Sequence, residues 1–185
     1  MRARSASISV SVKSKVLDYA QLTKMRLAWL VVLSALTGYF FALDMAYINW
    51  VQIFILILGG FMVTGSSNAF NQIIEKDLDK LMNRTSDRPL PDGRMEVNEA
   101  FWVASILGVF GVALLWIGLN PLSGILGLLA LFLYVAIYTP LKRVGPIAVF
   151  VGAFPGAIPP MLGYVAATNE FGLIPGLLFA TQFIW

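Results

Sequence analysis

Residues 45–74 read MAYINWVQIFILILGGFMVTGSSNAFNQII and contain no Asp, Glu, Lys or Arg. A membrane-spanning helix needs about 20 predominantly apolar residues, so this stretch is long enough to cross a bilayer. Further uncharged stretches occupy residues 27–43, 100–141, 144–169 and 171–185. The stretch at 100–141 can hold two helices, and Asn120-Pro121 provides a break between them. The fold class is therefore predicted to be all-α: a polytopic transmembrane helix bundle with five complete spans and the start of a sixth.

The composition narrows the chemistry that this chain can perform. The 185 residues are 58% hydrophobic and 12% charged, well below the roughly 25% charged residues of a soluble domain. Cysteine and histidine are both absent, which excludes a disulfide framework, a thiolate nucleophile and an imidazole base or ligand. Carboxylates and amides remain as the plausible metal ligands.

The basic residues predict how the chain is oriented. All 13 Lys and Arg lie before residue 27, within 75–99 or at 142–143, whereas the turns near 44–50, 119–123 and 166–172 contain none. The positive-inside rule places the basic side in the cytoplasm, so we expect an integral protein of the cell inner membrane whose N-terminus and 75–99 loop are cytoplasmic. The net charge of +3 reflects this topology and contact with membrane lipid, and we infer no nucleic-acid partner.

Two regions follow from this pattern. Residues 1–26 are predicted to be a cytoplasmic tail with an interfacial helix at 16–26, and residues 27–185 a transmembrane domain that includes the 75–99 loop. The stretch 171–185 would rise about 22 Å as a helix, short of the roughly 30 Å hydrocarbon core. We therefore expect the chain to be the front part of a longer protein.

One polar segment interrupts the apolar sequence, NQIIEKDLDKLMNRTSDRPLP at 71–91. Asn71, Glu75 and Asp79 recur at every fourth position, which advances only about 40° around a helix per step, so the three side chains share one face. Arg84 and Arg88 follow. Mg²⁺ favours carboxylate oxygens together with substrate phosphates, so the segment predicts a magnesium-diphosphate site; the alternative is a merely solvated loop.

Two further groups carry two interpretations each. Tyr138 and Lys142 lie one turn apart at the cytoplasmic face, either as part of the site or as an interfacial tyrosine with a positive-inside lysine. The stretch GAFPGAIPPMLGY at 152–164 is rich in glycine and proline, which predicts either a helix that is kinked or interrupted around a ligand chamber or close helix packing.

The residues resemble the UbiA superfamily of intramembrane prenyltransferases. The first family motif, N-x-x-x-D-x-x-x-D followed by R-T-x-x-R-P-L-x-x-G, is matched at 71–93 with Glu75 in place of the first aspartate, and a second, Y-x-x-x-K, at 138–142. TKMR at 23–26, YTPLKR at 138–143 and above all GAIPPMLGYVAAT at 156–168 are most similar to the protoheme IX farnesyltransferase (haem O synthase) branch.

The resemblance implies roles for individual residues. Asn71, Glu75 and Asp79 would be catalytic and hold Mg²⁺, and Tyr138 would orient or stabilise the ionising group. Arg84, Arg88 and Lys142 would bind the diphosphate, with Lys24 and Arg26 as weaker phosphate candidates.

The implied reaction transfers the farnesyl group of farnesyl diphosphate to a vinyl group of haem b, giving haem O. A second acidic motif would lie beyond residue 185, so this portion alone is expected to be inactive. Two alternatives stay open: a quinone precursor as acceptor in the same superfamily, or a transporter or lipid-phosphate binding protein. If the chain is a transporter, polar residues are expected halfway along the spans.

Overall fold

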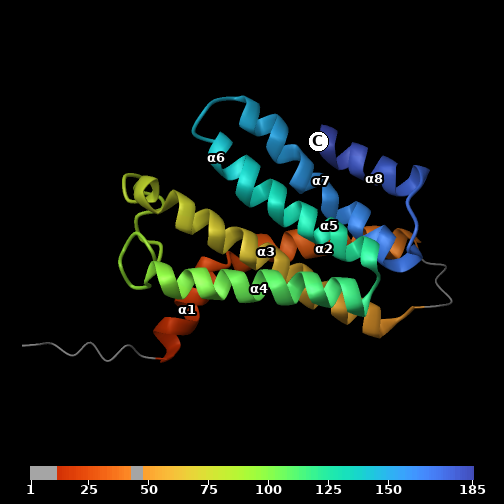
Figure 1. Cartoon of the computed structure of the whole chain (residues 1–185), viewed down its shortest axis with the longest axis horizontal. Coiled ribbons are helices and arrows are strands. Elements are labelled where there is room, and N and C mark those ends of the chain that lie inside the picture. Colours follow the sequence, from red (N-terminus) through yellow and green to blue (C-terminus); the bar gives the residue numbers. More distant parts are fainter. Residues whose placement is uncertain (1–11, 43–47) are drawn as a thin grey trace, which may run out of the picture.

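The computed structural model describes residues 12–42 and 48–185, and all regular structure within these ranges is helical (Figure 1). The elements, in chain order, are α1 (Val12–Leu22), α2 (Met25–Ala42), α3 (Trp50–Asp79), α4 (Val97–Gly118), α5 (Pro121–Phe132), the π-helical η1 (Leu133–Tyr138), α6 (Thr139–Leu141), α7 (Ile147–Thr168) and α8 (Leu173–Ile184).

Five helices are long and apolar enough to cross a membrane: α2, α3, α4, the continuous run Pro121–Leu141, and α7. The shorter apolar helix α8 follows them, so the predicted all-α bundle of five spans and the start of a sixth is confirmed. The long helices lie side by side, and α1 crosses them at one end (Figure 1).

Two features differ from the sequence-based expectation. The first helix begins at Val12 and ends at Leu22, before a turn in which Lys24 has a left-handed φ of 49°. Helix α7 runs without interruption from Ile147 to Thr168 although it contains three prolines. The second span continues as regular helix to Asp79, as the shared helix face of Asn71, Glu75 and Asp79 requires. Residues 1–11 of the predicted tail lie outside the described residues.

The helices approach closely where glycines replace larger side chains. At the crossing of α2 and α7, a Cβ at Gly38 would lie 1.9 Å from the carbonyl oxygen of Pro160, and one at Gly163 would lie 1.7 Å from that of Ala35. Neither glycine can be replaced unless the helices move apart. Such contacts stabilise bundles in lipid, where apolar burial alone gives no driving force.

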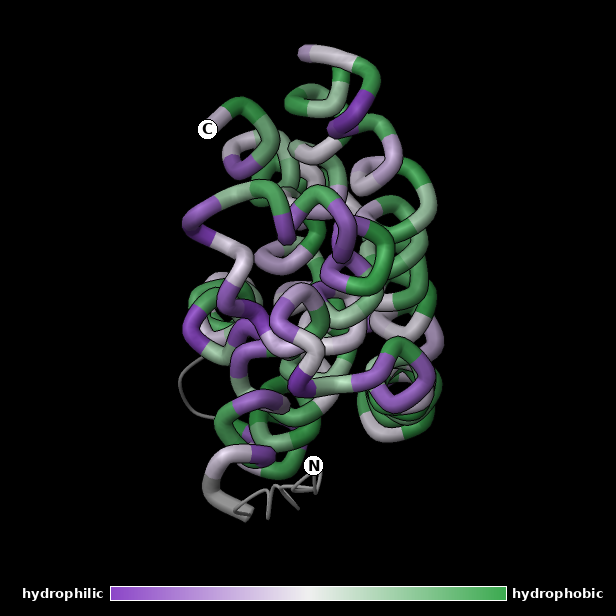
Figure 2. The backbone as a smooth tube through the Cα atoms, turned by 90° about the vertical axis from the view of Figure 1, so that its left-hand side faces the viewer, coloured by the Kyte–Doolittle hydropathy of each residue, from purple (hydrophilic) through white to green (hydrophobic). Residues whose placement is uncertain are grey.

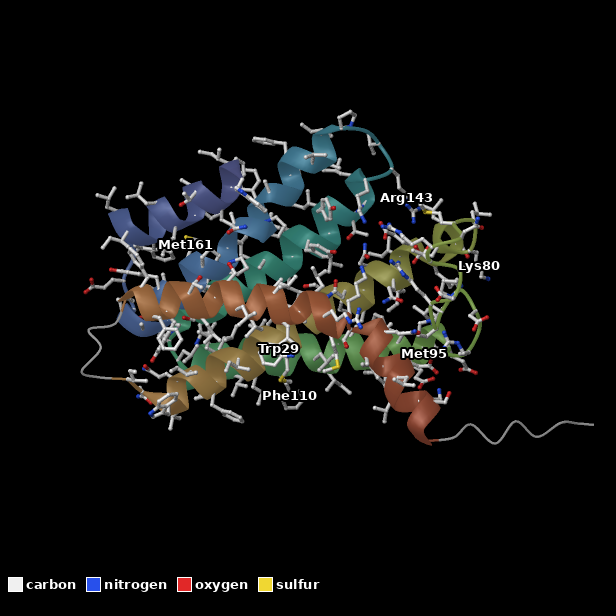
Figure 3. All side chains as sticks on the ribbon, turned by 180° about the vertical axis from the view of Figure 1, so that it is seen from behind. Trp29, Lys80, Met95, Phe110, Arg143 and Met161 are labelled. Atoms are coloured by element: carbon white, nitrogen blue, oxygen red, sulfur yellow. The ribbon has the colours of Figure 1, made fainter. Side chains whose placement is uncertain are left out.

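The two ends of the bundle differ in polarity. Viewed from the end that carries the α3–α4 loop, hydrophilic residues gather toward the viewer (Figure 2). From behind, Arg143 and Lys80 lie at that same end, whereas Met161 lies toward the opposite one (Figure 3). We call this the polar end.

The loop between α3 and α4 is folded onto the helices at the polar end. Leu90 and Met95 are 3% and 4% exposed and pack in a small core with Leu22, Ala69 and Ala100. The loop therefore covers the tips of α1, α3 and α4 as a cap of fixed shape.

Candidate active site

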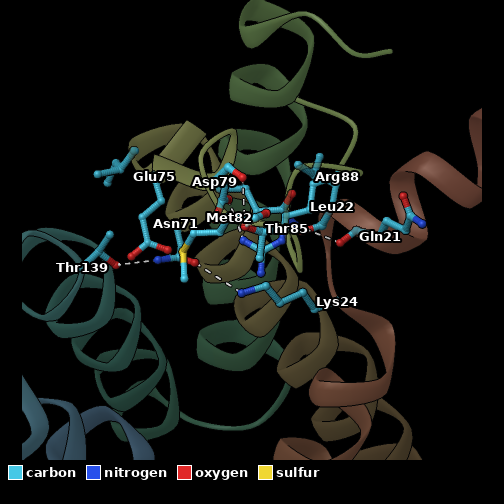
Figure 4. A network of polar contacts seen from close by, with 12 residues as sticks. Gln21, Leu22, Lys24, Asn71, Glu75, Asp79, Met82, Thr85, Arg88 and Thr139 are labelled. Atoms are coloured by element: carbon cyan, nitrogen blue, oxygen red, sulfur yellow. Dashed lines mark hydrogen bonds and ion pairs between the residues drawn. The ribbon is translucent and has the colours of Figure 1, made fainter. Parts of the chain in front are cut away.

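Three oxygen-bearing side chains line the last two turns of α3 at the polar end. Asn71 is fully buried, Asp79 is 4% exposed, and the Glu75 side chain is 14% exposed. The four-residue spacing puts them on one face of the helix, and they lie together in the view of Figure 4. Asp77 is exposed on another side of the helix.

Each of these three side chains has an oxygen that could bind a metal, and each faces a cationic side chain from a different segment. The partners come from the α1–α2 turn, the end of α6 and the α3–α4 loop: Lys24 Nζ lies 3.3 Å from Asn71 Oδ1, Lys142 Nζ lies 2.8 Å from Glu75 Oε1, and Arg88 Nη1 lies 2.6 Å from Asp79 Oδ2. Three donors and three cations thus converge in one place, which is the charge pattern that a metal-bound diphosphate needs.

Lys24 is held in an environment that disfavours its charge. Burial, followed by the nearby positive charges of Arg88 and Lys142, lowers the pKa of Lys24 to about 8. A local excess of positive charge of this kind is relieved by a bound anion. Lys24, which the sequence suggested only as a weak phosphate candidate, is therefore brought into the centre of the group. Arg26 is exposed, and no contact among the described residues gives it a role in binding phosphate.

Tyr138 and Lys142 lie next to each other, as their spacing predicts. Lys142 Nζ sits over the Tyr138 ring at 5.3 Å from its centroid while it also bonds Glu75. Arg143 donates to the carbonyl oxygen of Ile74 at 2.6 Å. The end of α6 is thereby fastened to the end of α3.

The two arginines of the loop are placed differently. Thr85 Oγ1 donates to the carbonyl oxygen of Asp79 at 3.0 Å and so caps the end of α3, turning the chain so that Arg88 reaches back to the Asp79 carboxylate. Arg84 is exposed and makes no hydrogen bond or ion pair with any residue that the structure describes. The structure brings Arg88 to the acids and leaves Arg84 outside.

An apolar cavity of about 390 Å³ lies between α2, α3, α5, η1 and α7. Its lining includes Asn68 and Tyr138, which are one turn from Asn71 and Lys142 respectively. The glycine-proline stretch shows both a chamber and close packing. Gly152 and Gly156 both line the cavity, and nothing lies near the missing Cβ of Gly156, whereas a Cβ at Gly152 would lie 2.6 Å from the Tyr138 ring.

The donor set fits a hard divalent cation. Within residues 12–42 and 48–185 no group of three or more Asp, Glu, His or Cys lies close enough to hold a metal. Glu75 and Asp79 offer two carboxylates, and Asn71 adds one amide oxygen. Mg²⁺ keeps several waters and takes one or two carboxylates plus substrate phosphates, so these residues could hold it with a diphosphate.

Several contacts at the site were not apparent from the sequence. Gln72 Nε2 donates to the carbonyl oxygens of Gln21 and Leu22, each at 2.9 Å, and Asn68 Nδ2 donates to that of Thr23 at 3.0 Å. These amides fix the α1–α2 turn on which Lys24 is mounted. One general signal pointed to such contacts, because amides deep in a span are costly unless they find partners.

Comparisons with known proteins show the family of the chain. Residues 31–185 match the model of the UbiA prenyltransferase family. The chain belongs to this family. It is 52% identical over 168 residues to a protoheme IX farnesyltransferase of Christiangramia forsetii and 50% identical over 175 residues to one of Flavobacterium psychrophilum. These alignments cover 91% and 94% of the chain but only 55% and 58% of the two relatives. The chain thus spans a little over half the length of these UbiA proteins.

Solved structures support the same fold for this UbiA family member. One, from work on digeranylgeranylglyceryl phosphate synthase in membranes, has a TM-score of 0.80 at 20% identity and covers 92% of this chain and 59% of that one. A UbiA homologue from Archaeoglobus fulgidus bound to GPP and Mg²⁺ has a TM-score of 0.72 at 17% identity, covering 90% of this chain and 60% of that one.

Proposed function

We propose that this protein transfers the farnesyl group of farnesyl diphosphate to a vinyl group of haem b, giving haem O, with Mg²⁺ as cofactor. One observation carries the proposal: three oxygen donors and three cations meet one helical turn from side chains that line an apolar cavity. A diphosphate with a long apolar tail matches this site. Its charged head would bind the oxygen donors and the cations, and its tail would fill the apolar cavity.

The head group would be received by the polar end. Asn71, Glu75 and Asp79 would hold Mg²⁺, which when bound supplies positive charge that offsets the charge of the leaving pyrophosphate. Lys24, Arg88 and Lys142 would neutralise the remaining phosphate charge, and the exposed Arg84 is proposed to join them. The first three cations already lie against the oxygen donors, so little movement is needed to reach a diphosphate seated there.

Ionisation would then proceed at the cavity mouth. The allylic C–O bond breaks, and pyrophosphate leaves with the electron pair. The farnesyl carbocation lies beside Tyr138, whose ring face already accepts the Lys142 ammonium at 5.3 Å. An aromatic face stabilises a cation electrostatically. The apolar walls and the folded loop exclude water from this cation.

The acceptor would complete the reaction with its vinyl π electrons, which form the new C–C bond to the farnesyl carbon. The cation left on the former vinyl group takes up water and releases a proton, giving the hydroxyethylfarnesyl side chain. Haem b is favoured as the acceptor by the protoheme IX farnesyltransferases that match the chain at 52% and 50% identity and by the stretch at 156–168.

The acceptor is tested by incubating the full-length protein with haem b, Mg²⁺ and labelled farnesyl diphosphate. We expect the label to appear in a haem of increased mass and not in an aromatic acid offered as competitor. Label that moves only to the aromatic acid would assign the protein to quinone biosynthesis instead. The matched Asp79→Asn variant should transfer label to neither acceptor.

A further inference from the structure

Asn71 is the one proposed metal donor whose two ends are chemically different. Its Oδ1 can bind a cation, whereas its Nδ2 carries only hydrogens and would repel one. A primary amide rotated by 180° occupies the same space. The side chain therefore needs something that decides which end faces the site, and because it is fully buried, water cannot do so.

The residue behind Asn71 is Thr139, which is also fully buried. Asn71 Nδ2 donates to Thr139 Oγ1 at 3.3 Å, and Thr139 Oγ1 donates in turn to the carbonyl oxygen of Tyr134 at 2.8 Å. The threonine hydroxyl has one hydrogen, and this hydrogen is already committed to Tyr134. Toward Asn71 the hydroxyl can only accept, so it must face the NH₂ end of the amide.

On the other side of the amide the requirement is reversed. Lys24 Nζ lies 3.3 Å from Asn71 Oδ1, and an ammonium can only donate. Figure 4 shows Thr139 and Lys24 on opposite sides of Asn71. An acceptor on one side and a donor on the other leave a single orientation, in which the oxygen faces Lys24.

The local helix geometry explains why the threonine hydroxyl is committed to Tyr134. Pro140 has no N–H and its ring crowds the carbonyl of the residue four positions earlier, and the turn before it widens into the π-helix Leu133–Tyr138. The Thr139 N–H then donates to the carbonyl oxygen of Tyr134, five residues back, and the hydroxyl joins the same oxygen. Single π-turns of this kind are common at functional sites.

We propose that Thr139 is a positioning residue that fixes the Asn71 amide with its oxygen toward the metal. This rests on the proposed function, because it takes Asn71 as a ligand. It assigns to Thr139, which would touch neither substrate nor metal, the task of selecting one of the two amide orientations.

The test measures metal affinity instead of turnover, with Mn²⁺ as a spectroscopic stand-in for Mg²⁺ and inorganic pyrophosphate present. Free Mn²⁺ is quantified by electron paramagnetic resonance in the intact protein and in Thr139→Val, which keeps the shape and removes the hydroxyl. Loss of a residue that orients a metal ligand costs about 10–100-fold in metal affinity, and we expect a loss in this range. Thr139→Ser should restore the affinity.

Two further variants separate orientation from general stability. In an Asn71→Asp background either end of the side chain is an oxygen, so adding Thr139→Val should leave the Mn²⁺ affinity unchanged. Thr168→Val removes a hydroxyl that also bonds a helix carbonyl, that of Tyr164 at 3.1 Å, far from the site, and should also have no effect.

The outcomes are distinct. If Thr139→Val weakens Mn²⁺ binding equally with Asn71 in place and in the Asn71→Asp background, the hydroxyl acts by stabilising the fold and the proposal is wrong. If Asn71→Ala weakens binding but Thr139→Val does not, the positioning role is wrong and the proposed site stands. If Asn71→Ala has no effect either, the metal site itself is wrong and both fall together.

Discussion

At the scale of single residues, the site depends on charged side chains that pair with one another in the free protein and would pair with metal or phosphate when the substrate binds. Asp79 holds Arg88 at 2.6 Å, and Glu75 holds Lys142 at 2.8 Å. A magnesium diphosphate supplies a new positive charge for each acid and new negative charge for each base. Binding therefore exchanges ion pairs and leaves no charge unpaired.

Asp79 and Asp77 provide a matched pair for testing this arrangement. Asp79→Asn removes a charge that faces the site, so we expect kcat/KM for farnesyl transfer to fall on the order of 100- to 1,000-fold, as when one preorganised stabilising group is lost. Asp77→Asn makes the same change on an exposed side of the same helix and should retain activity. Equal losses of activity in the two variants would show that the total charge of the segment matters for catalysis and that the side of the helix on which the charge lies does not.

Gly152 tests whether the placement of Tyr138 matters. In Gly152→Ala the new Cβ would lie 2.6 Å from Tyr138 Cε2, so the ring must move or the helices must separate. Overpacking costs about 1–3 kcal/mol, and we expect kcat to fall together with the thermal midpoint. Gly176→Ala, on α8 with nothing near its missing Cβ, is the control and should change neither. If Gly152→Ala keeps full activity, the placement of the Tyr138 ring does not matter for the reaction.

At the scale of elements, the short helix α1 is fastened to the site-bearing loop. Arg94 of the loop pairs with Asp18 of α1, which is 1% exposed, and also with Asp92. Lys15 pairs with Glu99 of α4 at 2.9 Å, and the Tyr19 hydroxyl donates to the same carboxylate at 2.7 Å. Helix α1 is thus part of the cap that covers the polar end.

Arg94→Gln should release this cap. The buried carboxylate of Asp18 loses its partner, and leaving such a group unsatisfied costs about 1–3 kcal/mol. We expect a lower thermal midpoint in detergent and faster proteolysis within residues 80–96. Lys80→Gln, an exposed change in the same loop, should leave the cleavage rate unaltered. If Arg94→Gln is cleaved no faster than the unmodified protein, the loop is held by its apolar core alone.

The sequence predicted the helices and the α3 face but not the contacts that complete the site. Apolar length is enough to locate a span, and a four-residue period is enough to align Asn71, Glu75 and Asp79. Which loop arginine reaches the acids depends on the Thr85 cap, and Thr139 reaches Asn71 only because of a π-turn. Both depend on local backbone geometry that neither composition nor periodicity encodes.

At the scale of the whole molecule, polarity is divided between the two ends of the bundle. The buried polar residues of α3 lie in its last half, from Ser66 to Asp79, which is the distribution expected of an enzyme whose substrate head group enters from the membrane surface. A transporter would carry them near the midplane. We propose that the polar end faces the cytoplasm, because the basic residues gather there.

The orientation can be tested directly because the chain has no cysteine. A single Lys80→Cys variant should react with a membrane-impermeant maleimide only after spheroplasts are opened. Glu170→Cys, at the exposed turn after α7, should react in intact spheroplasts. The opposite pattern of labelling would place the active site outside the cytoplasm.

The proposed chemistry requires the polar end of α3 to seat a divalent cation against a prenyl diphosphate. This requirement is tested by the affinity for Mn²⁺ in the presence of a farnesyl diphosphate analogue that cannot ionise, determined by electron paramagnetic resonance for the intact protein and for the Glu75→Gln/Asp79→Asn variant. We predict that the analogue strengthens Mn²⁺ binding in the intact protein and that this strengthening is lost in the variant. An equal effect of the analogue in both proteins would show that the two acids do not hold the metal.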